Sequence, residues 1–238
     1  MWLLEKRLLQ KQSPQRHRDT EKSQSQTEFV LGFPLCLCVS VVKDFRCLFL
    51  SILALTLVAC GETKLPSPFK ASDVSAKYAQ ADFHLYDASG APRSLKDYRG
   101  KVVAMFFGYT HCPDVCPTTL ADMAQVMRLL GKEADRVQVL FVTLDPERDT
   151  SAMLAKYVPA FNPAFMGLAG DTAATAQAAK AFGVSYEKQA GKNGGYTLDH
   201  SAGTYLIAPD GKFVLLAPYQ QNTDFLVQDI KLLLAMSR

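Results

Sequence analysis

The chain has 238 residues, of which 48% are hydrophobic and 21% are charged, as in a globular protein with a substantial apolar core. Its formal net charge of +3 comes from the first 59 residues, because residues 60–238 carry 18 Lys or Arg and 18 Asp or Glu. The basic excess thus belongs to the leader, and because nothing in the neutral remainder suggests a nucleic-acid surface, no nucleic-acid partner is expected.

Residues 1–59 have the features of a leader. Residues 1–28 are polar and are expected to be disordered. A basic flank at 43–46 precedes the 13 apolar residues 47–59, a stretch that is short for a membrane span and has the form of a secretory signal peptide. A signal peptide normally starts close to its basic flank, so the long upstream sequence indicates a start codon assigned too early, with initiation near Val41 or Val42.

The apolar run ends in Leu57-Val58-Ala59-Cys60-Gly61, which resembles the bacterial lipobox. This resemblance implies a lipid on Cys60 as the first mature residue. The protein would then be an exported bacterial lipoprotein that is anchored to a membrane and faces the periplasm or the cell exterior. An uncleaved anchor helix is the alternative. Residues 60–78, rich in Pro, Lys and Ser, are expected to be a tether, and residues 79–238 a single folded domain.

Only two of the six cysteines remain in that domain, Cys112 and Cys116. The others leave with the leader or carry the lipid: Cys36, Cys38, Cys47 and Cys60. One close pair in an exported protein is not a disulfide scaffold. The pair is therefore expected to be redox-active or metal-binding.

The predicted elements of the first half surround this pair. Strands are expected at 83–87, 102–107 and 137–144, where residues alternate or are apolar throughout, with an irregular or helical link at 94–101. A helix is expected at 118–130, so the two cysteines lie at a strand-to-helix turn. A second helix is expected over 153–158, ending at Pro159.

The second half predicts a short strand within 161–168 and an Ala-rich helix from Asp171 or Thr172 to Phe182, with Gly183 after it. Residues 188–197 are expected to be a flexible loop because they are rich in Gly, Lys and Asn. Strands at 204–207 and 212–217 flank a hairpin turn, and an amphipathic helix over 225–234 closes the chain.

This order of elements predicts an α/β fold with a central mixed β-sheet flanked by helices. With a cysteine pair opening the first crossover helix, it looks like the thioredoxin architecture. Residues 83–101 would form an N-terminal β-hairpin extension.

The cysteines are spaced C-x-x-x-C, whereas thioredoxin-type oxidoreductases carry C-x-x-C. On a helix, positions i and i+4 lie about 5–6 Å apart at Cβ, so two thiolates can converge on one ion. A helix N-terminus favours the thiolate, and copper(I) prefers thiolate and imidazole ligands. A disulfide can also bridge this separation. The spacing therefore leaves both metal binding and disulfide exchange open.

A tight mononuclear copper site needs a third ligand, and the predicted domain has three candidate histidines. His111 precedes Cys112, but adjacent side chains tend to diverge, and His84 has the position of an ordinary strand residue. His200 lies just before the predicted hairpin strand 204–207. In the thioredoxin architecture that loop packs over the cysteines and usually carries a cis-proline. This chain has His200 there, a residue that can bind a metal, in place of the proline. His200 is therefore the preferred third ligand.

Three blocks resemble the Sco/SenC family of cytochrome c oxidase assembly proteins: residues 108–117 its copper motif, 145–150 its second block and 199–201 its third. The resemblance implies a membrane-tethered, thioredoxin-like protein that holds one copper ion, Cu(I) or Cu(II), through Cys112, Cys116 and His200. Many family members have a transmembrane helix where this chain has a lipobox.

The resemblance also implies partners. These are the subunit of cytochrome c oxidase that bears the dinuclear CuA site, other periplasmic copper chaperones, and the membrane through the lipid anchor. The protein would deliver copper to the CuA site or keep its thiols reduced, which favours a metallochaperone over an enzyme. The alternative is a thiol–disulfide oxidoreductase in which Cys112 attacks and Cys116 resolves. A peroxidase is disfavoured because the supporting Thr is not placed as expected.

The second block can support the site. Asp145 is expected to end a strand beside the cysteine strand, with its carboxylate at the rim of the site as a possible accessory group. Arg148 and Asp149 are expected to form an ion pair, and Asp149 or Thr150 to cap the next helix.

Overall fold

The computed structural model describes residues 67–191 and 194–236. The predicted signal peptide, the early start codon and the lipidation of Cys60 lie outside these residues. Within them, no helix is both long enough and apolar enough to cross a membrane.

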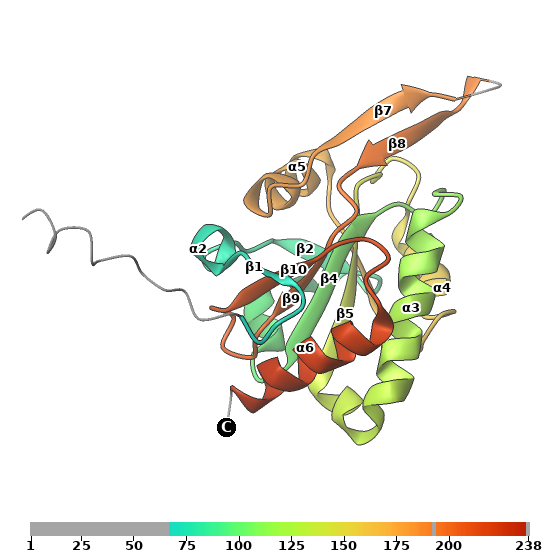
Figure 1. The fold of residues 1–238 in the computed structure, drawn as a ribbon. Helices are drawn as coiled ribbons and strands as arrows, with labels where there is room; N and C mark the ends of the chain where they lie inside the picture. Colours follow the sequence, from blue (N-terminus) through green and yellow to red (C-terminus); the bar gives the residue numbers. More distant parts are fainter. Residues whose placement is uncertain (1–66, 192–193, 237–238) are drawn as a thin grey trace, which may run out of the picture. The chain divides into compact units, whose positions relative to one another are not determined.

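An eight-stranded sheet forms the centre of the domain, in the order β1-β10-β9-β4-β5-β6-β2-β3 (Figure 1). The two middle strands run parallel, and a third parallel strand follows them, while the hairpin on the other side is antiparallel. These strands are β4 (Val102–Gly108), β5 (Val137–Thr143), β6 (Met166–Ala169), β9 (Thr204–Ile207) and β10 (Val214–Ala217).

The edges of the sheet are short strands. At one edge, β2 (Leu85–Asp87) and β3 (Pro92–Arg93) form the predicted N-terminal hairpin, and β2 also pairs with β6. The 3-10 helix η1 (Leu95–Tyr98) links β3 to β4, and η2 (Gly131–Arg136) leads into β5. At the other edge, β1 (Ser72–Asp73) pairs with β10.

Helices cover both faces of the sheet (Figure 1). One face carries α3 (Val115–Leu130), α4 (Ser151–Tyr157) and α6 (Thr223–Ala235), and the other carries α2 (Ser75–Tyr78) and α5 (Thr172–Ala181). The predicted mixed central sheet with helices on both sides is confirmed. The N-caps of α4 and α5 are the expected Thr150 and Asp171, and Gly183 has the positive φ of a helix end.

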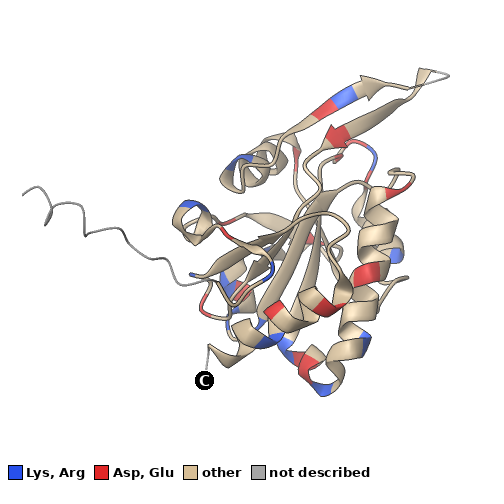
Figure 2. Ribbon diagram, viewed as in Figure 1, with Lys and Arg blue, Asp and Glu red and all other residues tan. Residues whose placement is uncertain are grey.

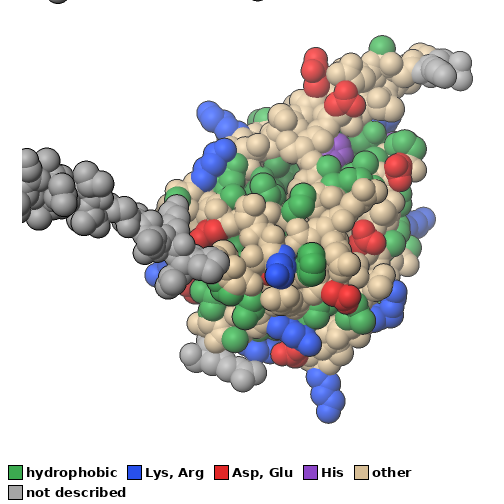
Figure 3. Space-filling view, in the orientation of Figure 1, with side chains coloured by type: hydrophobic (Ala, Val, Ile, Leu, Met, Phe, Trp, Pro, Cys, Tyr) green, Lys and Arg blue, Asp and Glu red, His purple; other side chains and the backbone are tan. Residues whose placement is uncertain are grey.

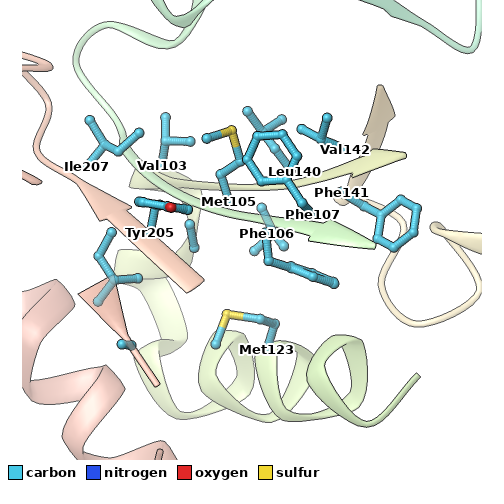
Figure 4. Close-up of a cluster of buried hydrophobic side chains, with 14 of the residues drawn as sticks. Val103, Met105, Phe106, Phe107, Met123, Leu140, Phe141, Val142, Tyr205 and Ile207 are labelled. Atoms are coloured by element: carbon cyan, nitrogen blue, oxygen red, sulfur yellow. The ribbon is translucent and has the colours of Figure 1, made fainter. Parts of the chain in front are cut away.

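All seven residues of β4 are buried, because helices pack against both faces of this strand. Figure 4 shows the alternation: Phe106 faces Met123 of α3, whereas Val103 and Met105 lie on the opposite side. The apolar run that predicted a buried strand therefore packs on both faces of the sheet. Charged residues of both signs are interspersed over the domain, as its neutral balance predicts (Figure 2).

The expected flexible loop at 188–197 is instead most of a β-hairpin. Strands β7 (Tyr186–Ala190) and β8 (Tyr196–His200) form a separate two-stranded antiparallel sheet that projects from the main sheet (Figure 1). Four of the five β7 residues are exposed. Apart from Tyr186, the side chains of β7 do not pack against the core and need no apolar alternation, so the pattern used to find strands missed β7.

The folded domain begins before the predicted boundary at residue 79. Ala71 and Tyr78 are buried, and β1 pairs with the sheet, so the last part of the expected tether belongs to the domain. The reason is Asp229 on α6, which is fully buried. Its carboxylate accepts the N–H groups of Lys70 and Ala71 at 2.8 and 2.7 Å.

Replacing Asp229 with Ala is expected to release this segment. The change leaves two backbone donors without an acceptor, so the free energy of unfolding should fall by about 3 kcal/mol in urea titrations. Asp224→Ala is the control, since Asp224 is exposed on the same helix, and its effect should stay within about 0.5 kcal/mol. Equal losses for the two variants would contradict this role of Asp229.

Candidate metal centre

The first thiol lies in the turn that joins β4 to α3. Cys112 is half-buried, and its N–H donates to the Tyr109 carbonyl at 3.2 Å. The helix begins at Val115 rather than at the predicted residue 118, so Cys112 precedes it and the two cysteines do not share a helix face. The turn brings them together instead, because the Cys116 N–H points at the Cys112 Sγ at 3.5 Å.

The second thiol is buried in the first turn of α3. Cys116 is 1% exposed, and a Cβ on Gly108 would lie 2.6 Å from its Sγ and 3.0 Å from Phe141 Cε2. Only glycine at position 108 leaves room for this sulfur. Burial raises the pKa of the Cys116 thiol, so a metal ion that binds this sulfur has to displace the proton.

The imidazole comes from the base of the projecting hairpin. His200 ends β8, and its Nδ1 lies 2.9 Å from the Ser201 carbonyl oxygen, so Nδ1 is the protonated donor. Nε2 therefore keeps its lone pair and lies 3.8 Å from the Cys116 Sγ. The Tyr109 ring stands edge-on to the imidazole, with ring centroids 6.0 Å apart.

Among the described residues, Cys112, Cys116 and His200 form a group whose ligand atoms all lie within 4.8 Å of one another. Donors on one first-row ion at about 2.0–2.3 Å are at most roughly 4.6 Å apart. A small movement of the hairpin or of the cysteine turn that brings the three ligand atoms closer together would thus complete a three-ligand site. Both cysteines are free thiols, and two thiolates with one imidazole suit copper.

The other two domain histidines lie apart from this group. The His111 side chain is 46% exposed, and its Nδ1 lies 3.1 Å from Thr110 Oγ1 and 3.6 Å from a carboxylate oxygen of Asp149. His84 is exposed just before β2, rather than half-buried within a strand as expected.

The Asp145 side chain is buried and fully engaged away from the donor group. Its carboxylate accepts from Arg148 Nε at 2.5 Å and from the Tyr196 hydroxyl at 2.7 Å. The prediction of an ion pair between Arg148 and Asp149 is therefore wrong, because Arg148 pairs with Asp145. Asp145 therefore helps to hold the β7–β8 hairpin through Arg148 and Tyr196.

Asp149 holds the cysteine turn in place, a role that the sequence did not predict. Its buried carboxylate accepts from Thr110 N–H at 2.9 Å, from Thr110 Oγ1 at 2.6 Å and from Thr143 Oγ1 at 2.6 Å. Capping of α4 falls to Thr150 alone. A short polar block directly after a buried strand is the only signal that pointed to this carboxylate.

The donor group opens into a groove between the start of α3 and strand β8. Its lining includes Tyr109, Cys112, Pro113, Leu198 and His200. Apolar side chains gather at the base of the hairpin on the face shown in Figure 3. A partner can therefore approach Cys112 and His200 from solvent, whereas Cys116 is reached only past them.

A parallel βαβ unit with a cysteine pair at its first crossover helix and a histidine in the facing segment defines a thioredoxin-like protein with a metal-binding donor set. Residues 71–235 match the SCO1/SenC family model, so the chain belongs to the SCO1/SenC family.

Relatives and solved structures agree with this membership. The mitochondrial SCO2 homolog of Mus musculus is 41% identical over 159 residues, which are 66% of this chain and 62% of that protein. Copper-bound ScoI of Bradyrhizobium japonicum is 41% identical with a TM-score of 0.59, over 63% of this chain and 96% of that one. Copper-bound yeast Sco1 is 32% identical with a TM-score of 0.58, over 63% and 84%. The chain thus spans less than two thirds of the mouse protein.

Replacing Gly108 with Ala is expected to damage the site and the fold together. The new methyl group displaces the Cys116 Sγ, so the free energy of unfolding should fall by about 1–3 kcal/mol, and Cu(I) affinity in competition titrations should fall with it. Gly195→Ala is the control, because a Cβ there meets nothing within 4 Å. Unchanged Cu(I) affinity in Gly108→Ala would show that the position of this sulfur is not critical.

Proposed function

We propose that the protein binds one copper ion and serves in the assembly of cytochrome c oxidase, where it delivers copper to the CuA site or keeps the thiols of that site reduced. The observation that carries this proposal is the convergence of Cys112, Cys116 and His200. Membership in the SCO1/SenC family and the copper in two similar solved structures support it.

The geometry of the site suits a protein that transfers its copper ion to a partner. The two ligands that face the groove, Cys112 and His200, are half-buried, while Cys116 is buried. A partner thiolate or imidazole can replace these two groove-facing ligands first while the buried thiolate still holds the ion. Exchange through shared ligands keeps the ion coordinated throughout, so it is never bare in solution.

The location and the partners are part of the same proposal. The CuA-bearing subunit of the oxidase would receive the copper, and other periplasmic copper chaperones would supply it. The lipobox-like sequence before Cys60 supports an exported, lipid-anchored protein, with the domain beginning near residue 71.

Copper titration of the full-length chain tests this function. The three leader cysteines and Cys60 are replaced by Ser in every variant, so that Cys112 and Cys116 are the only thiols. The reduced chain should bind one equivalent of copper. Because each thiolate is a ligand, Cys112→Ser and Cys116→Ser should lower Cu(I) affinity by at least about 100-fold.

In the same titration, His200→Ala should lower Cu(II) affinity and change the Cu(II) absorption spectrum. The control is His111→Ala, which removes an imidazole beside Cys112 that lies outside the donor group. No copper binding by the parent chain, or an unchanged Cu(II) spectrum in His200→Ala, would reject the proposed site.

The pairing of a half-buried thiol with a buried one favours a second candidate, a thiol–disulfide oxidoreductase. The Cys112 thiolate would attack a substrate disulfide and release one substrate thiolate. Cys116 would then attack Cys112 Sγ, release the second substrate thiolate and leave a Cys112–Cys116 disulfide. The substrate is reduced by two electrons and the protein is oxidised by two.

This candidate predicts a trapped intermediate. Cys116→Ser should accumulate a mixed disulfide with a disulfide-bonded CuA-type peptide, detected by mass spectrometry, and Cys112→Ser should form none. In the parent chain, the resolving step should accelerate as the pH rises above neutral, because burial raises the pKa of Cys116. If the parent chain does not reduce the peptide at any pH, the oxidoreductase function is excluded.

A further inference from the structure

We propose that Arg148 is a positioning residue for the third copper ligand: it clamps the β7–β8 hairpin to the end of β5 and so sets where His200 stands over the two thiols. The proposal rests on the proposed copper function and concerns how the site is held. We call Asp145, Arg148 and Tyr196 the hairpin clamp.

Arg148 makes two contacts with one residue of the hairpin, Tyr196. Its Nη1 donates to the Tyr196 carbonyl at 2.9 Å, and its guanidinium carbon lies 3.6 Å from the centroid of the Tyr196 ring. The side chain is only 25% exposed. A planar cation that both stacks on a ring and bonds the backbone beside it fixes the orientation of that residue as well as its distance.

The other end of the clamp is fixed in the core. Asp145 is 1% exposed, and its N–H donates to Thr143 Oγ1 at 3.0 Å, at the end of β5. One of its carboxylate oxygens accepts from Arg148 and the other from the Tyr196 hydroxyl. The three residues of the clamp thus form a closed set of contacts between a central strand and the hairpin.

The hairpin is attached to the domain at few places, among them the buried Leu198 side chain and an exposed ion pair between Lys188 and Glu147 at 2.7 Å. It pairs with no strand of the main sheet, and most of β7 is exposed. At its base, Ser201 N–H donates to the Ser185 carbonyl at 3.0 Å, and the two hydroxyls lie 3.0 Å apart. An isolated two-stranded hairpin is marginally stable, so its orientation depends on these contacts and on the clamp, and His200 lies at its base.

Two routes connect the clamp to the imidazole. Along β8, Tyr196, Leu198 and His200 share one side of the strand because side chains alternate, and Leu198 is buried. Through space, the Arg148 guanidinium lies 5.8 Å from the Tyr109 ring centroid, and that ring stands edge-on to His200. Loss of Arg148 removes support from both routes.

The two oxidation states of copper should respond differently. Two thiolates satisfy Cu(I), whereas Cu(II) depends more on the nitrogen ligand. A variant that only misplaces His200 should therefore weaken Cu(II) binding and leave Cu(I) binding nearly intact. General damage to the fold would weaken both.

The test compares Arg148→Met and Tyr196→Ala in the same full-length background. Tyr196→Ala leaves the ion pair of Arg148 and Asp145 intact, so it decides the matter if Arg148→Met fails to fold. Both variants should raise the Cu(II) dissociation constant about 10-fold to 100-fold, shift the Cu(II) spectrum towards that of His200→Ala, and change the Cu(I) constant less than about twofold.

Two comparisons separate positioning from general destabilisation. In the His200→Ala background, Tyr196→Ala should add no further loss of Cu(II) affinity, because no imidazole remains for Tyr196 to position. Arg93→Met is the matched control: Arg93 Nε donates to the buried Asp87 carboxylate at 2.8 Å, and this pair lies in the β2–β3 hairpin rather than at the copper group.

The outcomes are distinct. If the parent chain binds no copper, the proposed function fails. If it binds copper through His200, but Arg148→Met and Tyr196→Ala bind Cu(II) like the parent, the clamp does not position the ligand. Equal losses in Arg148→Met and Arg93→Met, or additive losses in the His200→Ala background, also overturn the proposal.

Discussion

The parallel register that sets Gly108 of β4 beside Thr143 of β5 is the constraint on which the metal centre depends. The Leu144 N–H closes this register with a bond to the Gly108 carbonyl at 2.7 Å. Because both strands end at the same edge, the cysteine turn and the 145–150 block emerge together. The buried Asp149 carboxylate then joins them through Thr110 and Thr143. Two of the three ligands are placed by backbone pairing in the core.

The third ligand depends on weaker interactions. His200 belongs to a hairpin with no core of its own, held by a serine pair at its base and by the hairpin clamp. The site therefore combines a rigid pair of thiols with an imidazole on a separately supported element. This division suits the proposed transfer of copper, because one ligand can move while the fold stays intact.

The sequence predicted the central strands, the capped helices and the three donor residues, since these depend on local patterns and on the three blocks. The predictions were wrong where contacts between residues far apart in the chain determine the structure. The early start of α3 and the pairing of Arg148 with Asp145 depend on tertiary contacts around the turn and the hairpin. Strand β7 carries mostly exposed side chains, so no periodicity revealed it, and β8 was hidden within the Gly-rich stretch that was expected to be a loop. Asp229, 158 residues from Ala71, gave no sequence signal for where the domain begins.

The separate sheet of the hairpin has a practical consequence. Its tip closes with a bond from Gly191 N–H to the Gly195 carbonyl, and a side chain added at Gly195 would meet nothing within 4 Å. Exposed loop tips tolerate added groups well. A spin label or fluorophore at Gly195 would move with the strand that carries His200 while leaving the central sheet undisturbed. The molecule thus offers its own attachment point for following ligand motion in real time.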